Sequence, residues 1–195
     1  SPLTVIKMLP RELQLLTNPE VPDGANHVAY AYSADGTDRF TTTYPNLNLL
    51  DGTTKTTQTA NIHENDDASI VVRDPKQLSG KNVTGSVYLD LTKSNNDVGV
   101  QLYTTNGVLS GNVIKAGQKG YSSFSGKVPT ITDDKTNIYF RRPEKGNNTT
   151  TFDYSEMKVE EGSTATPYMP SASEVTAEDY PSYIGTYTDN KSNEQ

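Results

Sequence analysis

Residues 136–171 read TNIYFRRPEKGNNTTTFDYSEMKVEEGSTATPYMPS, and the fold of the whole chain is predicted from this stretch outward. Apolar and polar side chains alternate over residues 138–141, and the alternation resumes over residues 152–159 after a polar run that contains Gly146. Alternation with a period of two is typical of half-buried strands, and a polar turn between two such runs indicates a β-hairpin. We therefore expect two neighbouring antiparallel strands here.

The end of the stretch predicts a turn followed by an extended segment. The second strand closes with Glu160, Glu161 and Gly162, and the apolar residues that follow stand beside Pro167 and Pro170. Prolines at these positions prevent a helix. We expect residues 165–170 to form a short, non-helical apolar clasp.

Similar alternation recurs upstream, with turn residues about every eight to twelve positions. It predicts strands at residues 47–50, 68–73, 83–92, 98–103, 108–115 and 121–128, while residues 53–65 are either a long loop or a short edge strand. Asn106-Gly107 is the strongest two-residue hairpin signal. No helical period competes in this range. The chain is therefore predicted to be all-β, with a jelly-roll β-sandwich at its centre.

The two ends of the chain are predicted to be extended arms. The N-terminal arm includes residues 1–45, with a short helix at residues 10–16 and a short hairpin around Asp35-Gly36 that joins residues 28–32 to a strand starting at Phe40. The central jelly-roll domain is assigned to residues 46–170. The C-terminal tail, residues 171–195, has one short helical turn capped from Ser173 or Thr176 before Pro181.

The composition argues against several functional classes. Hydrophobic residues make up 32% of the chain, there is no cysteine, and the formal net charge is −7. Disulfides and thiolate metal sites are therefore excluded. No apolar run of about eighteen residues is present, so we expect no membrane insertion.

The excess negative charge is concentrated at one end of the chain. Residues 1–150 carry fifteen acidic and fifteen basic side chains, whereas residues 151–195 carry nine acidic and two basic ones. Without clustered Lys and Arg, we expect no nucleic-acid partner. The acidic end is either a solvated surface or a contact for a basic partner.

Residues suited to catalysis are few. His27 and His63 are the only histidines, and no known hydrolase, zinc-protease or phosphate-binding motif occurs. A pair of carboxylates can hydrolyse glycosides, and Asp90 with Glu156 is the best candidate because both are predicted to lie on strands. Carboxylates on strands are ordinarily part of a solvated face. We therefore expect no enzymatic activity.

Three segments carry a family resemblance: residues 35–50 (DGTDRFTTTYPNLNLL), 157–170 (MKVEEGSTATPYMP) and 177–187 (AEDYPSYIGTY). They resemble the carbohydrate-binding jelly-roll modules of tail and baseplate proteins of phages that infect Gram-positive cocci, and among these the accessory baseplate proteins of lactococcal phages. An N-L-L-x-G stretch opens the jelly roll in these modules, and residues 48–52 match it. Between these segments the chain matches in pattern only.

The resemblance implies a virion protein of the tail tip or baseplate. It implies host cell-wall polysaccharide and other baseplate or tail proteins as partners. Related modules commonly hold a structural calcium through an aspartate of the last strand, but Ser155 occupies that position here and is a poor calcium ligand. We expect no cofactor and no metal, with Asp153 or Asp51 as the alternative calcium ligands.

A saccharide needs hydrogen-bond partners for its hydroxyls and a flat apolar surface for its C–H groups, and tyrosine supplies both. Outward positions on three predicted strands carry suitable side chains and form the candidate saccharide site if the strands share a sheet: Tyr88, Asp90, Gln101, Tyr103, Tyr139 and Arg141. Ordinary cross-strand pairing on a solvated sheet is the alternative explanation.

Two functions remain open from the sequence. The first is a non-enzymatic module that attaches a phage baseplate to host cell-wall saccharide. The second is a structural adaptor that joins baseplate subunits through residues 1–22 and 171–187 without binding sugar.

Overall fold

The computed structural model of the protein describes residues 4–7 and 26–188. The chain divides into two compact units, residues 47–173 and residues 1–46 with 174–195. Within the described ranges, the secondary structure is β except for two short 3-10 turns, which confirms the all-β prediction. No helix in these ranges is long and apolar enough to cross a membrane.

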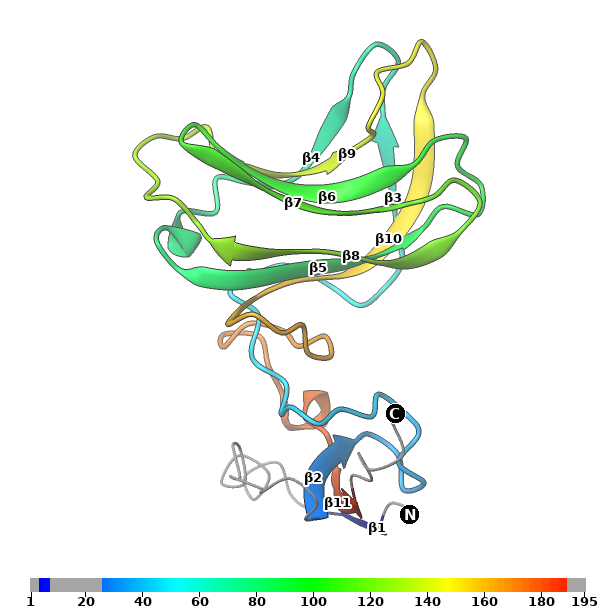
Figure 1. The fold of residues 1–195 in the computed structure, drawn as a ribbon, viewed down its shortest axis with the longest axis vertical. Coiled ribbons are helices and arrows are strands. Elements are labelled where there is room, and N and C mark those ends of the chain that lie inside the picture. Colours follow the sequence, from blue (N-terminus) through cyan, green and yellow to red (C-terminus); the bar gives the residue numbers. More distant parts are fainter. Residues whose placement is uncertain (1–3, 8–25, 189–195) are drawn as a thin grey trace, which may run out of the picture. The chain divides into compact units, whose positions relative to one another are not determined.

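Residues 47–173 form a sandwich of two four-stranded antiparallel sheets (Figure 1). The first sheet has the order β3 (Gln58–Ile62), β10 (Thr150–Glu161), β5 (Asn82–Asp90), β8 (Lys119–Lys127). The second has the order β4 (Ala68–Arg73), β9 (Asn137–Arg141), β6 (Val98–Thr104), β7 (Gly107–Ile114). Apart from the β6–β7 hairpin, each strand is followed by one in the other sheet. Eight strands in two such sheets make a jelly roll.

The core lies between the two sheets and follows the predicted alternation. Its fully buried side chains include Val83, Val87 and Leu89 of β5 and Val98, Val100 and Leu102 of β6. The Phe140 ring of β9 meets the Phe152 ring of β10 edge to face, with centroids 5.1 Å apart. This contact joins the two sheets because the two strands belong to different sheets.

The predicted hairpin at residues 138–159 is wrong, although both of its strands exist. β9 pairs with β4 and β6, whereas β10 pairs with β3 and β5. The polar run between them, residues 142–149, is a crossover from one sheet to the other. A local pattern of polar residues cannot distinguish a tight turn from such a crossover.

Arg142 explains why the crossover takes this path. Its side chain is fully buried, and its guanidinium uses all five N–H groups. Nε donates to Asp66 O at 2.8 Å; Nη1 donates to Asn148 O at 2.7 Å and Thr150 Oγ1 at 2.9 Å; Nη2 donates to His63 O at 3.0 Å and Gly146 O at 3.1 Å. One side chain therefore fixes both the β9–β10 crossover and the β3–β4 loop.

The strand predicted at residues 47–50 is also wrong. This segment is irregular apart from a single bridge between Asn48 and Ser171, and the side chain of Asn48 adds hydrogen bonds to β10. Asn48 Nδ2 donates to Met157 O at 2.9 Å, and its Oδ1 accepts from Val159 N at 3.0 Å. Leu50 is still buried in the core, so the match of this segment to the opening of related modules concerns packing and not strand formation.

Other predictions in the sandwich are confirmed. Residues 53–65 contain β3 as an edge strand, and β6 joins β7 by a hairpin in which Thr104 pairs with Gly107. A 3-10 turn at Lys76–Leu78, which the sequence did not predict, buries Leu78.

The clasp at residues 165–170 is held by a buried ion pair on β10. Lys158 Nζ lies 3.3 Å from Glu160 Oε2, with side chains 1% and 0% exposed. Lys158 also donates to Thr166 Oγ1 and Pro167 O, and Thr166 N donates to Glu160. Burial lowers the pKa of Lys158 to about 8, although the carboxylate of Glu160 opposes this shift.

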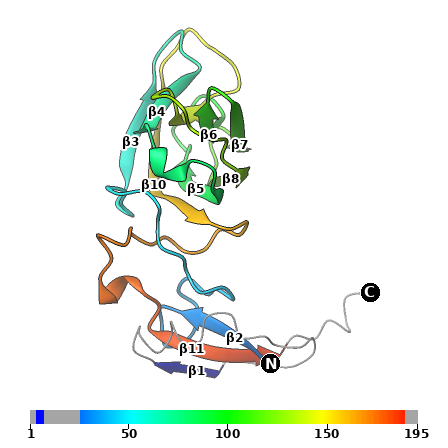
Figure 2. The same cartoon turned by 90° about the vertical axis from the view of Figure 1, so that its left-hand side faces the viewer.

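The smaller unit is a three-stranded sheet in which β11 (Tyr183–Thr188) lies between β1 (Thr4–Lys7) and β2 (Asn26–Ala31) (Figure 2). The predicted hairpin of residues 28–32 with a strand from Phe40 is reduced to a single bridge between Tyr30 and Thr41. β2 pairs instead with the C-terminal strand, so the two ends of the chain share one sheet.

Two further predictions concern the flanks of the smaller unit. The predicted helical turn is the 3-10 turn Ala177–Asp179, capped by Thr176 and Asp179. The helix predicted at residues 10–16 lies outside the described residues.

Candidate functional site

Four of the six predicted saccharide residues lie on the outer face of the β4-β9-β6-β7 sheet. Gln101 of β6 pairs with Tyr139 of β9, and Gly99 pairs with Arg141, so Gln101, Tyr139 and Arg141 point to the same side. Tyr103 follows two residues after Gln101 on that side. The sheet is bowed, and this outer face is its hollow side (Figure 1).

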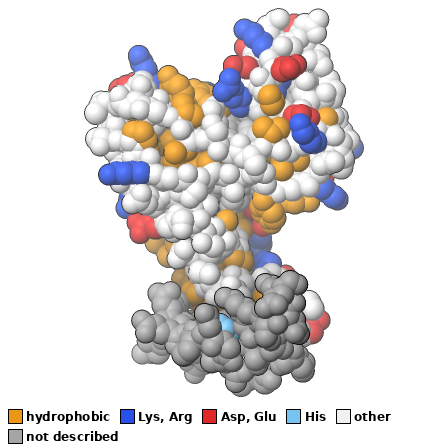
Figure 3. All heavy atoms as spheres, viewed as in Figure 1, with side chains coloured by type: hydrophobic (Ala, Val, Ile, Leu, Met, Phe, Trp, Pro, Cys, Tyr) orange, Lys and Arg blue, Asp and Glu red, His pale blue; other side chains and the backbone are white. Residues whose placement is uncertain are grey.

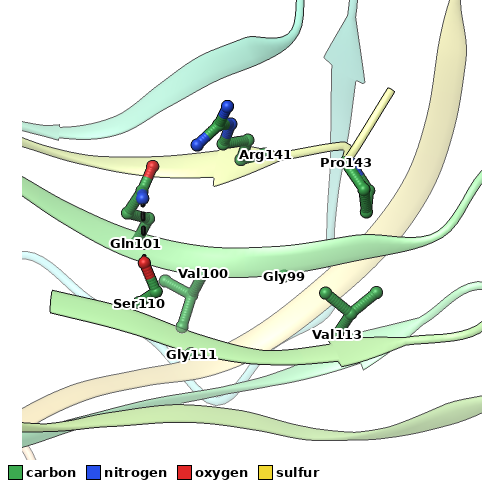
Figure 4. A pocket seen from close by; sticks show the side chains of 8 residues that line it. All are labelled: Gly99, Val100, Gln101, Ser110, Gly111, Val113, Arg141 and Pro143. Carbon is green, nitrogen blue, oxygen red and sulfur yellow. Dashed lines mark hydrogen bonds between the residues drawn. The ribbon is translucent and has the colours of Figure 1, made fainter. Parts of the chain in front are cut away.

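A pocket of about 250 Å³ opens on this face (Figure 4). It is lined by Gly99, Val100, Gln101, Ser110, Gly111, Val113, Arg141 and Pro143. Gly99 and Gly111 place bare backbone in the lining. A Cβ at Gly99 would stand 3.1 Å from Asn112 O, and one at Gly111 would stand 2.9 Å from Ser122 Oγ, so both positions favour glycine because neighbouring atoms approach closely.

The polar side of the pocket is ordered. Gln101 Nε2 donates to Ser110 Oγ at 3.0 Å, which fixes the amide with its oxygen turned toward the outer face (Figure 4). Arg141 projects over the same area, with its side chain 47% exposed and one nitrogen 3.7 Å from Asp67 Oδ2. The Gln101 carbonyl oxygen, an acceptor, and the Arg141 guanidinium, a donor, therefore line the same pocket from the neighbouring strands β6 and β9.

Aromatic surface adjoins these polar groups. The rings of Tyr103 and Tyr139 lie 5.9 Å apart at 58°, and Tyr103 is 38% exposed. Val108 of β7 pairs with Tyr103 and is also exposed. The hollow face thus offers flat apolar area next to hydrogen-bonding groups, which is the combination that a sugar ring needs.

The other two predicted residues, Tyr88 and Asp90, lie elsewhere. They belong to β5 and point outward from the opposite sheet. The condition that all three strands share a sheet is therefore not met. The six residues form two groups on opposite faces of the sandwich, and only the group on the hollow face adjoins the pocket.

The charged groups around the pocket are concentrated near the crossover. Figure 3 shows Lys, Arg, Asp and Glu side chains crowded at the end of the sandwich where the β3–β4 and β9–β10 loops lie. These loops are joined by a hydrogen bond from Asn65 N to Gly146 O at 2.8 Å. Since Arg141 ends β9 directly before Arg142 and Pro143 follows it in the crossover, the buried guanidinium positions one wall of the pocket.

The proposed calcium ligands have protein partners. Asp153 Oδ1 accepts from Thr59 Oγ1 at 2.9 Å, and Asp51 Oδ1 accepts from Ser173 Oγ at 3.0 Å. The hydroxyls of Ser171 and Ser173 lower the pKa of Asp51. In the part of the chain that the structure describes, no three His, Asp or Glu side chains are grouped to hold a metal ion.

Sequence reasoning missed six of the eight residues that line the pocket. Ser110, Val113 and Pro143 gave no signal of their own, because they join the site only through the register of β7 against β6 and the path of the crossover. The hairpin around Asn106-Gly107 could have predicted Ser110, since its two-residue turn pairs Ser110 with Gln101.

Comparison with known proteins places this fold beside a solved structure from a phage baseplate. The chain is similar to a chain of the tripod (BppUct-A-L) from the baseplate of bacteriophage Tuc2009, with a TM-score of 0.62 and 28% sequence identity over 88% of this chain and 75% of that chain. No protein-family model and no curated protein matches the chain.

The fold and this likeness together define the class. The protein is an all-β sandwich protein with a structural counterpart in a phage baseplate, which supports a baseplate or tail role. The same likeness supports a location in the virion baseplate.

Proposed function

We propose that the protein is an accessory baseplate protein of the BppA type, whose sandwich adheres to host cell-wall saccharide through the hollow face of the β4-β9-β6-β7 sheet. The pocket that brings Gln101 and Arg141 together beside the exposed ring of Tyr103 and the half-buried ring of Tyr139 carries this proposal. The likeness to a baseplate chain supplies the biological setting.

The contacts follow from the chemistry of the face. The Gln101 oxygen accepts from a sugar hydroxyl, and Arg141 donates to ring or hydroxyl oxygens. Tyr103 offers its ring to the C–H face of a neighbouring sugar unit. Such a shallow site binds weakly, with a Kd near about 1 mM. Many copies on one particle raise the overall affinity.

Binding without turnover is part of the proposal. Asp90 and Glu156, the best carboxylate pair, have other partners: Asp90 Oδ1 accepts from Thr92 N at 3.0 Å, and Glu156 accepts from the Tyr121 hydroxyl. Neither residue lines the pocket. Incubation with host cell-wall polysaccharide is therefore expected to release no soluble sugar.

The structural-adaptor function is the second candidate. The related structure is a tripod named for several components, and the smaller unit of this chain is a separate compact body built from both chain ends. Phe40 of this unit is 46% exposed. Docking of residues 1–46 and 174–195 to other baseplate proteins is compatible with saccharide binding by the sandwich.

A cell-wall pull-down tests the saccharide function. Gln101→Ala, Tyr139→Ala and Arg141→Ala are each expected to reduce the amount of protein retained on purified host cell walls by about fivefold or more, while the far-UV circular dichroism stays unchanged. Lys127→Ala, which removes an exposed cation from the opposite sheet, is the matched control for Arg141→Ala. Full retention of all three variants would remove the hollow face as the binding site and leave the adaptor function.

A further inference from the structure

The outer face of the β3-β10-β5-β8 sheet carries an aromatic and carboxylate cluster made by Tyr88, Tyr121 and Glu156. Tyr88 pairs with Tyr121 across β5 and β8, and the two rings meet at 63° with centroids 5.1 Å apart. Tyr121 is 54% exposed, and its hydroxyl donates to the Glu156 carboxylate, 3.0 Å from Oε2 and 3.1 Å from Oε1. A large exposed ring is therefore held in one orientation.

Glu156 reaches this position through an irregularity in β10. The register shifts between Ser155 and Lys158, so an extra residue bulges out of the ladder. Glu156 has φ of 61°, in the left-handed region that favours glycine, and its N–H donates to Thr54 O at 3.0 Å. The bulge itself needs no side chain here. A carboxylate kept at a conformationally unfavourable position indicates a use for that carboxylate.

The charges on this face differ from those of the hollow face. Asp90 pairs with Lys119 on one side and with Asp153 on the other, in the row next to Tyr88. Asp90, Asp153 and Glu156 therefore contribute three carboxylates to this face, and Lys119 contributes one ammonium group. An anionic ligand is disfavoured here, whereas the hollow face presents the guanidinium of Arg141.

We propose that the Tyr88, Tyr121 and Glu156 cluster is a second saccharide site, specific for uncharged pyranose rings with neighbouring hydroxyls. The C–H face of the sugar packs on the exposed ring of Tyr121. Each Glu156 oxygen keeps a lone pair after accepting from the tyrosine, so two adjacent sugar hydroxyls donate to the two oxygens. The sandwich then engages saccharide on both outer faces, which goes beyond the function proposed for the pocket.

Two sites on opposite faces change how the module holds a cell wall. A single pocket binds one stretch of polysaccharide, while a second site captures another stretch at high local concentration once the first is bound. The overall affinity for wall fragments is therefore expected to exceed that for a monosaccharide by more than tenfold.

Nuclear magnetic resonance with simple sugars tests the site. The ¹⁵N-labelled full chain is titrated with methyl β-D-glucopyranoside, methyl β-D-galactopyranoside and the methyl glycoside of glucuronic acid. We expect at least one neutral glycoside to shift the amide signals of residues 88, 121 and 156. The glucuronide should shift them at least fivefold less at the same concentration.

Variants separate this site from the pocket. Tyr121→Leu and Glu156→Gly should abolish the shifts at the cluster and leave any shifts at residues 101 and 139 unchanged. Glu156→Gly should keep or raise the Tm, because glycine relieves the left-handed backbone, so loss of binding cannot be ascribed to unfolding. Arg141→Ala should have the reverse effect on the two sets of signals.

The outcomes are decisive in both directions. The second site is overturned if neither neutral glycoside shifts the cluster, if the glucuronide binds there as well as they do, or if Tyr121→Leu leaves the shifts in place. Shifts at the cluster with none at residues 101 and 139 would keep the second site and contradict the proposed pocket.

Discussion

The crossover around Arg142 and the clasp around Lys158 both place a cation in the interior, but they stabilise it differently. Arg142 is surrounded by four backbone carbonyls and one hydroxyl, with no carboxylate among these partners. Lys158 is paired with Glu160. The first arrangement spreads one charge over loops from distant parts of the chain, whereas the second is local to one strand and the segment it holds.

The crossover and the clasp therefore have different roles: the crossover positions the pocket, and the clasp stabilises the sandwich. The crossover continues directly into the pocket wall, so its geometry and the binding face depend on each other. The clasp lies against β10 of the opposite sheet and is remote from that face in the strand order. Disturbing the first should therefore affect stability and binding together, and disturbing the second should affect mainly stability.

Loss of the Arg142 guanidinium is expected to have the largest effect. Arg142→Met removes five hydrogen bonds donated by a fully buried charged group, and bonds to a charged group contribute about 1.5 to 3 kcal/mol each before relaxation. We expect the free energy of unfolding of the sandwich to fall by at least about 3 kcal/mol in urea titrations followed by circular dichroism. Retention on host cell walls should fall as well.

Arg141→Met is the matched control, because it removes the same group from the adjacent, half-exposed position. It should lower cell-wall retention with little change in stability. Equal stability losses in the two variants would contradict the distinct roles assigned to the two arginines.

Breaking the clasp comes second. Lys158→Met leaves the buried carboxylate of Glu160 without its cation, which typically costs about 3 to 5 kcal/mol, and the bonds from Thr166 offset part of this cost. We expect a loss of about 3 kcal/mol with cell-wall retention unchanged at temperatures where the protein is folded. The double variant Lys158→Met with Glu160→Gln should be more stable than the single variant, since the uncompensated charge is gone.

The pH dependence of stability offers a smaller effect. Burial lowers the pKa of Lys158 to about 8, so above this pH the unfolded chain holds more protons at residue 158 than the folded chain. The free energy of unfolding therefore rises with pH through this window. Relative to Lys158→Met, the native protein should gain about 1 to 2 kcal/mol between pH 8 and about pH 10. A flat difference between the two proteins would show that the lysine keeps its ordinary pKa.

The smallest effect is expected at the exposed partner of Arg141. Asp67→Ala removes an ion pair that spans 3.7 Å with both side chains about half exposed. Such pairs contribute about 0 to 1 kcal/mol, so the Tm should change little. Retention on cell walls should stay the same or increase, because Arg141 is released toward the pocket. A marked loss of retention would show that Asp67 holds Arg141 in its binding position.

Local patterns predicted most of the strands and the side that each residue faces. Alternation over residues 83–90 and 98–103 identified β5 and β6 and their buried positions, because the period of two is a property of each strand alone. The same property explains why Gln101, Tyr139 and Arg141 were placed on outward positions correctly.

The alternation of side chains could not predict which strands pair with one another. β9 and β10 belong to different sheets, and the crossover between them is held by Arg142, whose partners come from residues 63–66 and 146–150. Likewise, β2 pairs with β11 from the far end of the chain. The sheet that contains Tyr88 could not be predicted either, because it depends on strand pairing. The six residues expected on one face therefore lie on two opposite faces of the sandwich.

The sandwich starts and finishes at neighbouring points. Asn48 and Ser171 form a parallel bridge, and Ser173 donates to Asp51. Both flanking segments belong to the other unit. The 127-residue stretch from 47 to 173 is therefore a domain inserted into the sequence of the smaller unit. Exchanging that domain for another with equally close ends would leave the sheet of β1, β11 and β2 intact, and under the proposed function it would change the saccharide that is bound.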